Sequence, residues 1–125
     1  MITKEEIYNY ISNAITTDFP ECYVTGKYEP IPKSLPCVFA YQQTKTRQTR
    51  YATLDNEDVQ NRIVWEIQVY AEMMNECYSI IDTIEATMKS MGFYEEFCQP
   101  TTNADPRIFR VILRFGRVLA DNDTI

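Results

Sequence analysis

Histidine is absent from this sequence of 125 residues. Its imidazole is the side chain that enzymes most often use as a general base, and it is the commonest metal ligand. Serine and cysteine nucleophiles that depend on a neighbouring histidine are therefore excluded. Because the groups that the usual reactions need are missing, we expect a protein that is not an enzyme.

Glycine is scarce, and its spacing argues against a phosphate-binding loop. The three glycines are Gly26, Gly92 and Gly116, and no two of them lie close enough to cradle a phosphate. The acidic stretch 55–58 superficially resembles a calcium loop, but it lacks the glycine and the distant glutamate that such a loop uses. We interpret it as a solvated turn and expect no cofactor.

The four cysteines lack the paired spacing of a zinc site. They lie far apart in the chain among apolar neighbours, which favours reduced, buried thiols over disulfides. These residues are Cys22, Cys37, Cys77 and Cys98. We therefore expect no metal centre and no disulfides.

Long apolar runs are also missing. The richest stretch, Arg107 to Leu119, is interrupted by Arg110, Arg114 and Gly116, so no membrane span is expected. The first residues begin a helical pattern instead of a signal peptide. The net charge of −6, from 12 basic and 18 acidic residues, argues against a general affinity for nucleic acid or anionic membranes.

Hydrophobic periodicity predicts two helices and several strands. Thr3 and Glu6 form a capping box before a helix over 4–16, and a second helix over 76–91 ends before Gly92, where a left-handed residue is expected. Period-two alternation predicts strands at 22–28, 37–43, 63–71, 93–97 and 108–119. The residues between 44 and 61 are polar and predict a charged loop.

This order predicts an α+β fold with a mainly antiparallel sheet and two helices packed on one face. We expect a single domain over residues 1–120 and a flexible C-terminal end over 121–125. The core should form where the sheet meets the second helix, from Trp65, Ile67, Ile84, Phe109, Val111 and Leu113.

Two basic groups are candidate contact sites. Lys45, Arg47, Arg50 and Tyr51 lie in a predicted hairpin tip, which is either plain solvent-exposed loop, a contact with an acidic protein surface, or a contact with DNA. Three cations are few against an acidic chain, so a protein contact is the preferred functional interpretation.

Arg110 and Arg114 share one face of the last strand, in a sheet that should be half exposed. Their face is either solvent-exposed or one side of a subunit contact in which guanidinium groups pair with carboxylates.

Several segments after Leu35 are informative in their order and spacing. They are a proline-led strand 35–39, a strand 65–71, a helix closing over 84–93, a connection 100–105, a strand 107–111 and the ending 121–125. In this order they resemble the tail-terminator, tail-completion and minor capsid-like proteins of tailed bacteriophages and prophages. The chain departs from the pattern after Ala71, where relatives often carry a longer glycine-containing turn.

The resemblance implies a structural protein that forms a ring, usually of six copies, at the head–tail junction of the virion. Such a ring caps the tail tube, meets the connector on the head side and lets DNA pass without specific binding. It would be assembled in the host cytoplasm. The alternatives are a head-completion or stopper protein of the connector, and a small cytoplasmic adaptor that binds a peptide along its sheet edge.

Overall fold

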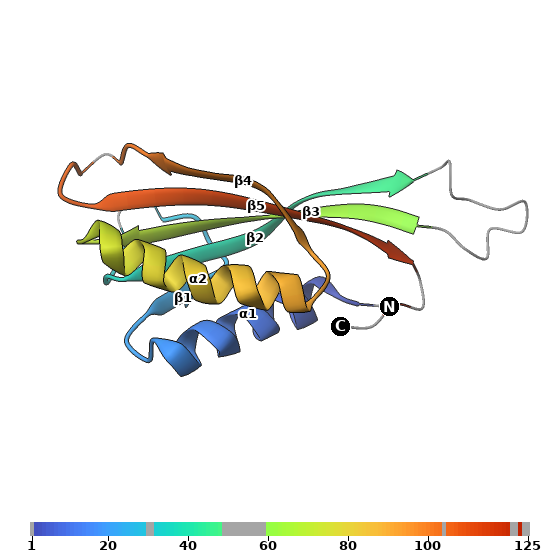
Figure 1. Cartoon of the computed structure of the whole chain (residues 1–125), viewed down its shortest axis with the longest axis horizontal. Coiled ribbons are helices and arrows are strands. Elements are labelled where there is room, and N and C mark those ends of the chain that lie inside the picture. The colour runs from blue at the N-terminus through green and yellow to red at the C-terminus, as the bar shows by residue number, and fades with distance from the viewer. Residues whose placement is uncertain (1, 30–31, 49–59, 104, 121–122, 124–125) are drawn as a thin grey trace, which may run out of the picture.

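The protein folds into two layers, a five-stranded sheet and a pair of helices that cover one of its faces (Figure 1). The computed structural model describes residues 2–29, 32–48, 60–103, 105–120 and 123. The elements are α1 (Lys4–Asp18), β1 (Tyr23–Thr25), β2 (Cys37–Gln48), β3 (Gln60–Ala71), α2 (Met74–Ser90), β4 (Tyr94–Thr101) and β5 (Phe109–Ala120). This arrangement confirms the predicted α+β class and the packing of both helices on one face.

The sheet has the strand order β1-β2-β3-β5-β4. Every neighbouring pair is antiparallel except β1 and β2, which are parallel. Strand β1 pairs with β2 only from Cys37 to Phe39, so it is much shorter than the strand expected at 22–28. From Ala40 onward β2 continues to Gln48 paired with β3, and no described strand lies on its β1 side.

The N-terminus of α1 and the C-terminus of α2 follow the expected capping rules. The backbone N–H of Glu6 donates to the Thr3 hydroxyl at 3.1 Å, as the capping box predicts. Helix α1 continues to Asp18, two residues past the expected end, and stops before Phe19 and Pro20. After α2, Gly92 has a φ of 83°, the left-handed conformation that glycine adopts without strain.

The core lies between the sheet and the helices. Trp65, Ile67, Ile84, Val111 and Leu113 are buried there, as predicted from the sequence. Phe109 is instead 40% exposed, so its predicted burial is wrong. It is the first residue of β5 and lies beside Met74, where α2 only begins, so the helix layer covers it incompletely.

Three further predictions need correction. The charged loop expected over 44–61 is strand at both ends, because β2 continues to Gln48 and β3 begins at Gln60. These polar residues are extended because β2 and β3 pair with each other along this stretch. The pairing has a register shift between Gln42 and Thr44. Strand β4 runs to Thr101 instead of ending at residue 97. Cys98 on β4 is exposed, unlike the other three cysteines, because β4 is an edge strand.

The C-terminal end expected at 121–125 lies outside the described residues except for Asp123, whose carboxylate is 3.9 Å from the Arg117 guanidinium. Among the helices that the structure describes, none is long and apolar enough to cross a membrane.

The two faces of β5 should respond differently to truncation. Leu113 is fully buried against the helices, so Leu113→Ala should lower the free energy of unfolding by about 2–5 kcal/mol. Its neighbour Ile112 points to the other face and is only half-buried, so Ile112→Ala should cost clearly less. Urea denaturation of both variants measures the difference. An equal or larger loss from Ile112→Ala would contradict this assignment of the two faces.

Candidate protein-interaction surface

The face of the sheet that points away from the helices carries an unusual concentration of paired polar groups. We call it the outer face and define it by Tyr41 on β2, by Glu66, Gln68 and Tyr70 on β3, and by Arg110, Ile112 and Arg114 on β5. In the β3–β5 ladder, Tyr70 lies opposite Arg110, Gln68 opposite Ile112, and Glu66 opposite Arg114. Directly opposed side chains in an antiparallel pair are within contact distance.

Strand β3 is buried on both sides, which the sequence did not predict. Its residues on the helix side form the core, while Glu66, Gln68 and Tyr70 are also buried on the other side. The neighbouring strands explain this burial, because long side chains of β2 and β5 lie across the centre of the outer face. The expectation of a half-exposed sheet therefore holds for β5 but not for β3.

Glu66 is the centre of the polar network. Its carboxylate accepts hydrogen bonds from the Tyr41 hydroxyl at 2.5 Å, the Gln68 amide at 3.0 Å and the Arg114 guanidinium at 3.0 Å. Only 6% of the Glu66 side chain is exposed, against 39% for Arg114. A buried carboxylate is tolerated when its charge is paired and its oxygens are hydrogen-bonded, and both conditions are met here.

Gln68 connects this centre to a second arginine. Its amide oxygen accepts from Arg110 through Nε at 3.1 Å and Nη2 at 2.8 Å, and from the Tyr70 hydroxyl at 2.6 Å. The Arg110 guanidinium also lies 5.6 Å from the centre of the Tyr70 ring. Both arginines are therefore fixed at their inner side, and their remaining N–H groups are presented outward in a defined orientation.

Aromatic rings border the polar network on both sides. The rings of Phe39 and Tyr41 are stacked with centres 4.8 Å apart, and the half-exposed ring of Tyr28 leans on Phe39 at 5.8 Å. On the β4 side, the Arg114 guanidinium lies 5.0 Å from the centre of the Phe97 ring. Cations over aromatic rings keep their charge while losing mobility, which suits a contact surface.

Electrostatics keep Glu66 charged. Burial alone would raise its pKa, but the hydrogen bonds from Tyr41, Gln68 and Arg114, together with the Arg114 charge, lower that pKa below the usual value. Burial and the hydrogen bond to Glu66 raise the pKa of Tyr41 to about 12, so its hydroxyl remains a proton donor. At neutral pH the network consists of a carboxylate that accepts hydrogen bonds from neutral and cationic donors.

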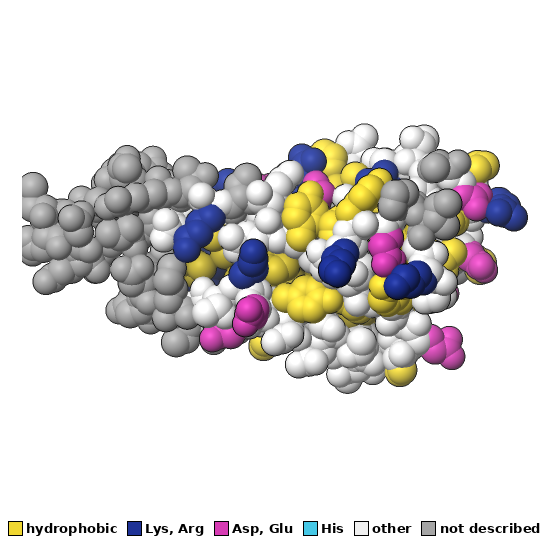
Figure 2. Space-filling model, turned by 180° about the vertical axis from the view of Figure 1, so that it is seen from behind, with side chains coloured by type: hydrophobic (Ala, Val, Ile, Leu, Met, Phe, Trp, Pro, Cys, Tyr) yellow, Lys and Arg dark blue, Asp and Glu magenta, His cyan; other side chains and the backbone are white. Residues whose placement is uncertain are grey.

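The outward side of this network is accessible. In Figure 2, which shows the molecule from behind, hydrophobic side chains lie interspersed with those of lysine and arginine. Val118 on β5 and Tyr28 are exposed apolar groups in the same region, at 41% and 57% exposure. Exposed arginine and aromatic groups over a fixed base are typical of protein contact surfaces.

The structure brings only some of the predicted site residues together. Arg110 and Arg114 lie on one face, as expected, and their polar partners are Gln68 and Glu66. Lys45 is exposed and lies within β2, where Arg47 also falls, so neither belongs to a hairpin tip. Arg50 and Tyr51 lie outside the described residues. The two basic groups are therefore separate features.

Sequence reasoning missed Glu66, Gln68 and Tyr41. A signal was present, because Glu66 is the only charged residue in the predicted strand 63–71. Charged residues at such positions are rarely buried unless they are paired. What the sequence could not supply was the register that places Glu66 opposite both Tyr41 and Arg114.

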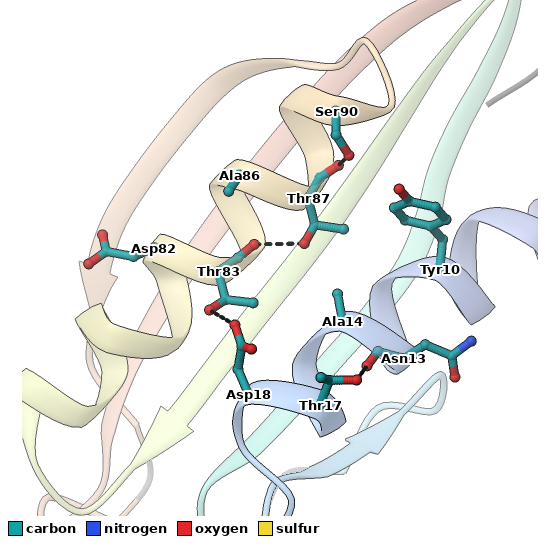
Figure 3. A pocket seen from close by; sticks show the side chains of 10 residues that line it. All are labelled: Tyr10, Asn13, Ala14, Thr17, Asp18, Asp82, Thr83, Ala86, Thr87 and Ser90. Carbon is teal, nitrogen blue, oxygen red and sulfur yellow. Dashed lines mark hydrogen bonds between the residues drawn. The ribbon is translucent and has the colours of Figure 1, made fainter.

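The groove between the two helices has a volume of about 680 Å³. Figure 3 shows that Tyr10 and Ala14 of α1 face Thr83 and Thr87 of α2 across it. Its hydroxyl groups are already engaged, since Thr83 donates to Asp18 at 2.9 Å and Thr87 donates to a backbone carbonyl of its own helix. The groove therefore offers a ligand few free polar groups.

Two carboxyl groups, those of Glu85 and Glu95, lie where α2 meets β4. A hydrogen bond with Glu95 is the main cause that raises the pKa of Glu85 to about 7, aided by burial and by the charges of Glu95 and Asp82. Neighbouring carboxylates repel each other, which favours the protonated form of Glu85. Among the residues that the structure describes, no group of three or more potential ligands is placed to hold a metal ion.

Comparison with known proteins adds no assignment. No family model matches the chain, and no curated protein matches it.

The buried network should make stability depend on pH through Glu66. The pKa of Glu66 is lower in the folded protein, so its contribution to the free energy of unfolding is complete when the pH is above the usual pKa of a glutamate. That contribution is lost as the pH falls through the lowered pKa. Glu66→Gln should reduce the free energy of unfolding by about 1–3 kcal/mol at pH 7, with a smaller difference below about pH 4. Glu21→Gln, at an exposed turn, is the control. A pH-independent difference would contradict an ionised Glu66.

Glu85 should show the opposite dependence. The pKa of Glu85 is raised in the folded protein, so its contribution to the free energy of unfolding is complete when the pH is below the usual pKa of a glutamate. That contribution is lost as the pH rises towards about 7. Glu85→Gln stays neutral throughout, so it should melt at a higher temperature than the parent at pH 8 and at the same temperature at pH 4. Thermal melts at both values decide this. A variant that is no more stable than the parent at pH 8 would contradict the raised pKa of Glu85.

Proposed function

We propose that this protein is a structural component of a tailed bacteriophage that forms a ring at the head–tail junction. In this role it caps the tail tube and meets the connector on the head side. The proposal includes a homo-oligomer, with six copies as the expected number, through which DNA passes without specific binding. Its place would be the virion, after assembly in the host cytoplasm.

The outer face is the observation that carries the proposal. Arg110 and Arg114 are held from below by Gln68 and Glu66, so binding a neighbour costs little additional side-chain ordering. Preorganised arginines beside aromatic rings are suited to pairing with carboxylates on another subunit. The resemblance of the segments after Leu35 to tail-terminator proteins supports the phage assignment.

The charge distribution supports contacts between unlike faces. The outer face presents arginines, whereas α1 and α2 carry Glu5, Glu6, Glu76, Asp82 and Glu85 on the opposite side of the molecule. A heterologous contact, in which one surface of a subunit meets a different surface of the next, closes into a ring when the rotation permits. Opposite charges on the two surfaces favour that arrangement over face-to-face pairing.

The basic segment from Lys45 to Tyr51 is a second proposed contact, with a neighbouring protein in preference to DNA. Lys45 is exposed on β2, and the acidic balance of the chain disfavours a stable grip on phosphates.

Charge reversal on the outer face tests the proposal. In Arg110→Glu the fold should persist, because residue 110 is only half-buried and the Tyr70 hydroxyl still donates to the Gln68 amide oxygen. The variant should fail to join its neighbours and to cap tail tubes. Lys89→Glu, at an exposed site on α2, changes the charge equally but adds to the acidic surface, so it should not reduce assembly.

The measurement is electron microscopy of each protein mixed with its own tail-tube protein, together with native mass spectrometry of the oligomer. A parent that forms no ring even on tube ends, or an Arg110→Glu variant that caps tubes at the parental level, would contradict the proposal.

A further inference from the structure

The groove between α1 and α2 lies on the opposite side of the sheet from the outer face (Figures 1 and 3). We call it the helix groove. It is lined by Tyr10, Ala14 and Asp18 on α1 and by Asp82, Ala86 and Thr87 on α2. Small side chains on two packed helices leave room for the side chains of another layer. Since its threonine hydroxyls are engaged within the protein, the groove suits packing against a protein surface better than binding a polar small molecule.

The helix groove carries negative charge that its own lining residues do not neutralise. Asp18 and Asp82 are among its described lining residues, and no lysine or arginine is. Asp18 accepts a hydrogen bond from the neutral Thr83 hydroxyl at 2.9 Å. Asp82 is exposed and has no hydrogen bond or ion pair to a described residue. Two copies that met groove to groove would bring like charges together, which disfavours a symmetric contact through this side.

Arg110 carries the complementary charge on the outer face. Its neighbour Arg114 forms an ion pair with Glu66, so that positive charge is compensated within the protein. Arg110 is instead held by the neutral amide oxygen of Gln68, at 3.1 Å from Nε and 2.8 Å from Nη2, and has no carboxylate partner among the described residues. An arginine that is fixed by a neutral group keeps its full charge available for an anion on another molecule.

The apolar groups of the two surfaces agree with this pairing of charges. Tyr28 and Val118 are exposed in the region of the outer face, and Tyr10 is 42% exposed at the helix groove. No described element covers the outer side of either layer. A sheet that packs on helices is a common layer arrangement, and this chain already uses it between its own sheet and helices. The outer face of one copy therefore matches the helix side of another in both charge and layer type.

We propose that the outer face of one copy docks on the helix groove of a second copy, with Arg110 of the first pairing with Asp82 of the second. The contact joins unlike surfaces, so each copy keeps one surface of each kind for a further neighbour. This inference rests on the proposed contact through the outer face and names the surface that this face meets. Because it involves only copies of this chain, purified protein suffices to test it.

An exchange of the two charges tests the contact. Arg110→Glu and Asp82→Arg each place like charges opposite one another and should weaken self-association at least about tenfold. The double variant that carries both changes restores opposite charges in the reverse order, so it should recover most of the association. Glu72→Arg is the matched control, because it makes the same change of charge at an exposed bend between β3 and α2, outside the helix groove. It should associate like the parent.

Sedimentation velocity over a series of concentrations up to about 1 mM measures the association of each protein. Thermal melts report that the variants are folded, which is expected for Asp82→Arg because Asp82 is exposed and has no partner to lose. The inference is overturned by a parent that stays monomeric throughout the series, or by an Asp82→Arg protein that associates like the parent. It is also overturned by a double variant that associates no better than the single ones.

The docking of copies and the proposed function can fail separately. If Asp82→Arg caps tail tubes and associates as the parent does, the ring is built through other surfaces, and the inference is wrong while the phage role stands. If the double variant regains association but neither it nor the parent forms rings on tube ends, the contact between copies stands and the phage role is wrong.

Discussion

A carboxylate buried in the middle of a sheet is the constraint on which the outer face depends. Glu66 has three donors from three different strand positions, and the loss of any one would leave part of its charge unsatisfied. The cost of burying it explains why Tyr41, Gln68 and Arg114 have fixed orientations. The same hydrogen bonds hold Arg110 and Arg114 in place, so the exposed sides of these two arginines form a rigid surface. Stability and surface shape therefore share one origin.

Much of the fold could be predicted from the sequence because its strongest patterns are local. The capping box at Thr3, the apolar stripe that places Ile84 in α2, and the left-handed Gly92 each depend on neighbours within a few residues. The burial of Leu113 followed from simple alternation. These features need no knowledge of which strands pair.

The rest depends on pairings between distant parts of the chain. Alternation correctly placed Arg110 and Arg114 on one face, but it could not show that Glu66 and Gln68 lie beneath them. The sequence predicts a loop for the polar residues at the end of β2 and the beginning of β3. They are strand because the two strands pair with each other there, which a local pattern cannot show. The brevity of β1 and the exposure of Phe109 likewise follow from where other elements end.

The two-sided burial of β3 also determines how the sheet can be aligned as it forms. A shift by one residue would turn Glu66 towards the apolar core and Trp65 towards the arginines, and both changes are unfavourable. Strands β2 and β3 are separated in the sequence by residues 49–59, a connection much longer than the two-residue turns that dictate alignment. Side-chain chemistry must therefore choose the correct alignment. Glu66 therefore disfavours alignments shifted by one residue during folding, since they would leave its charge without a partner.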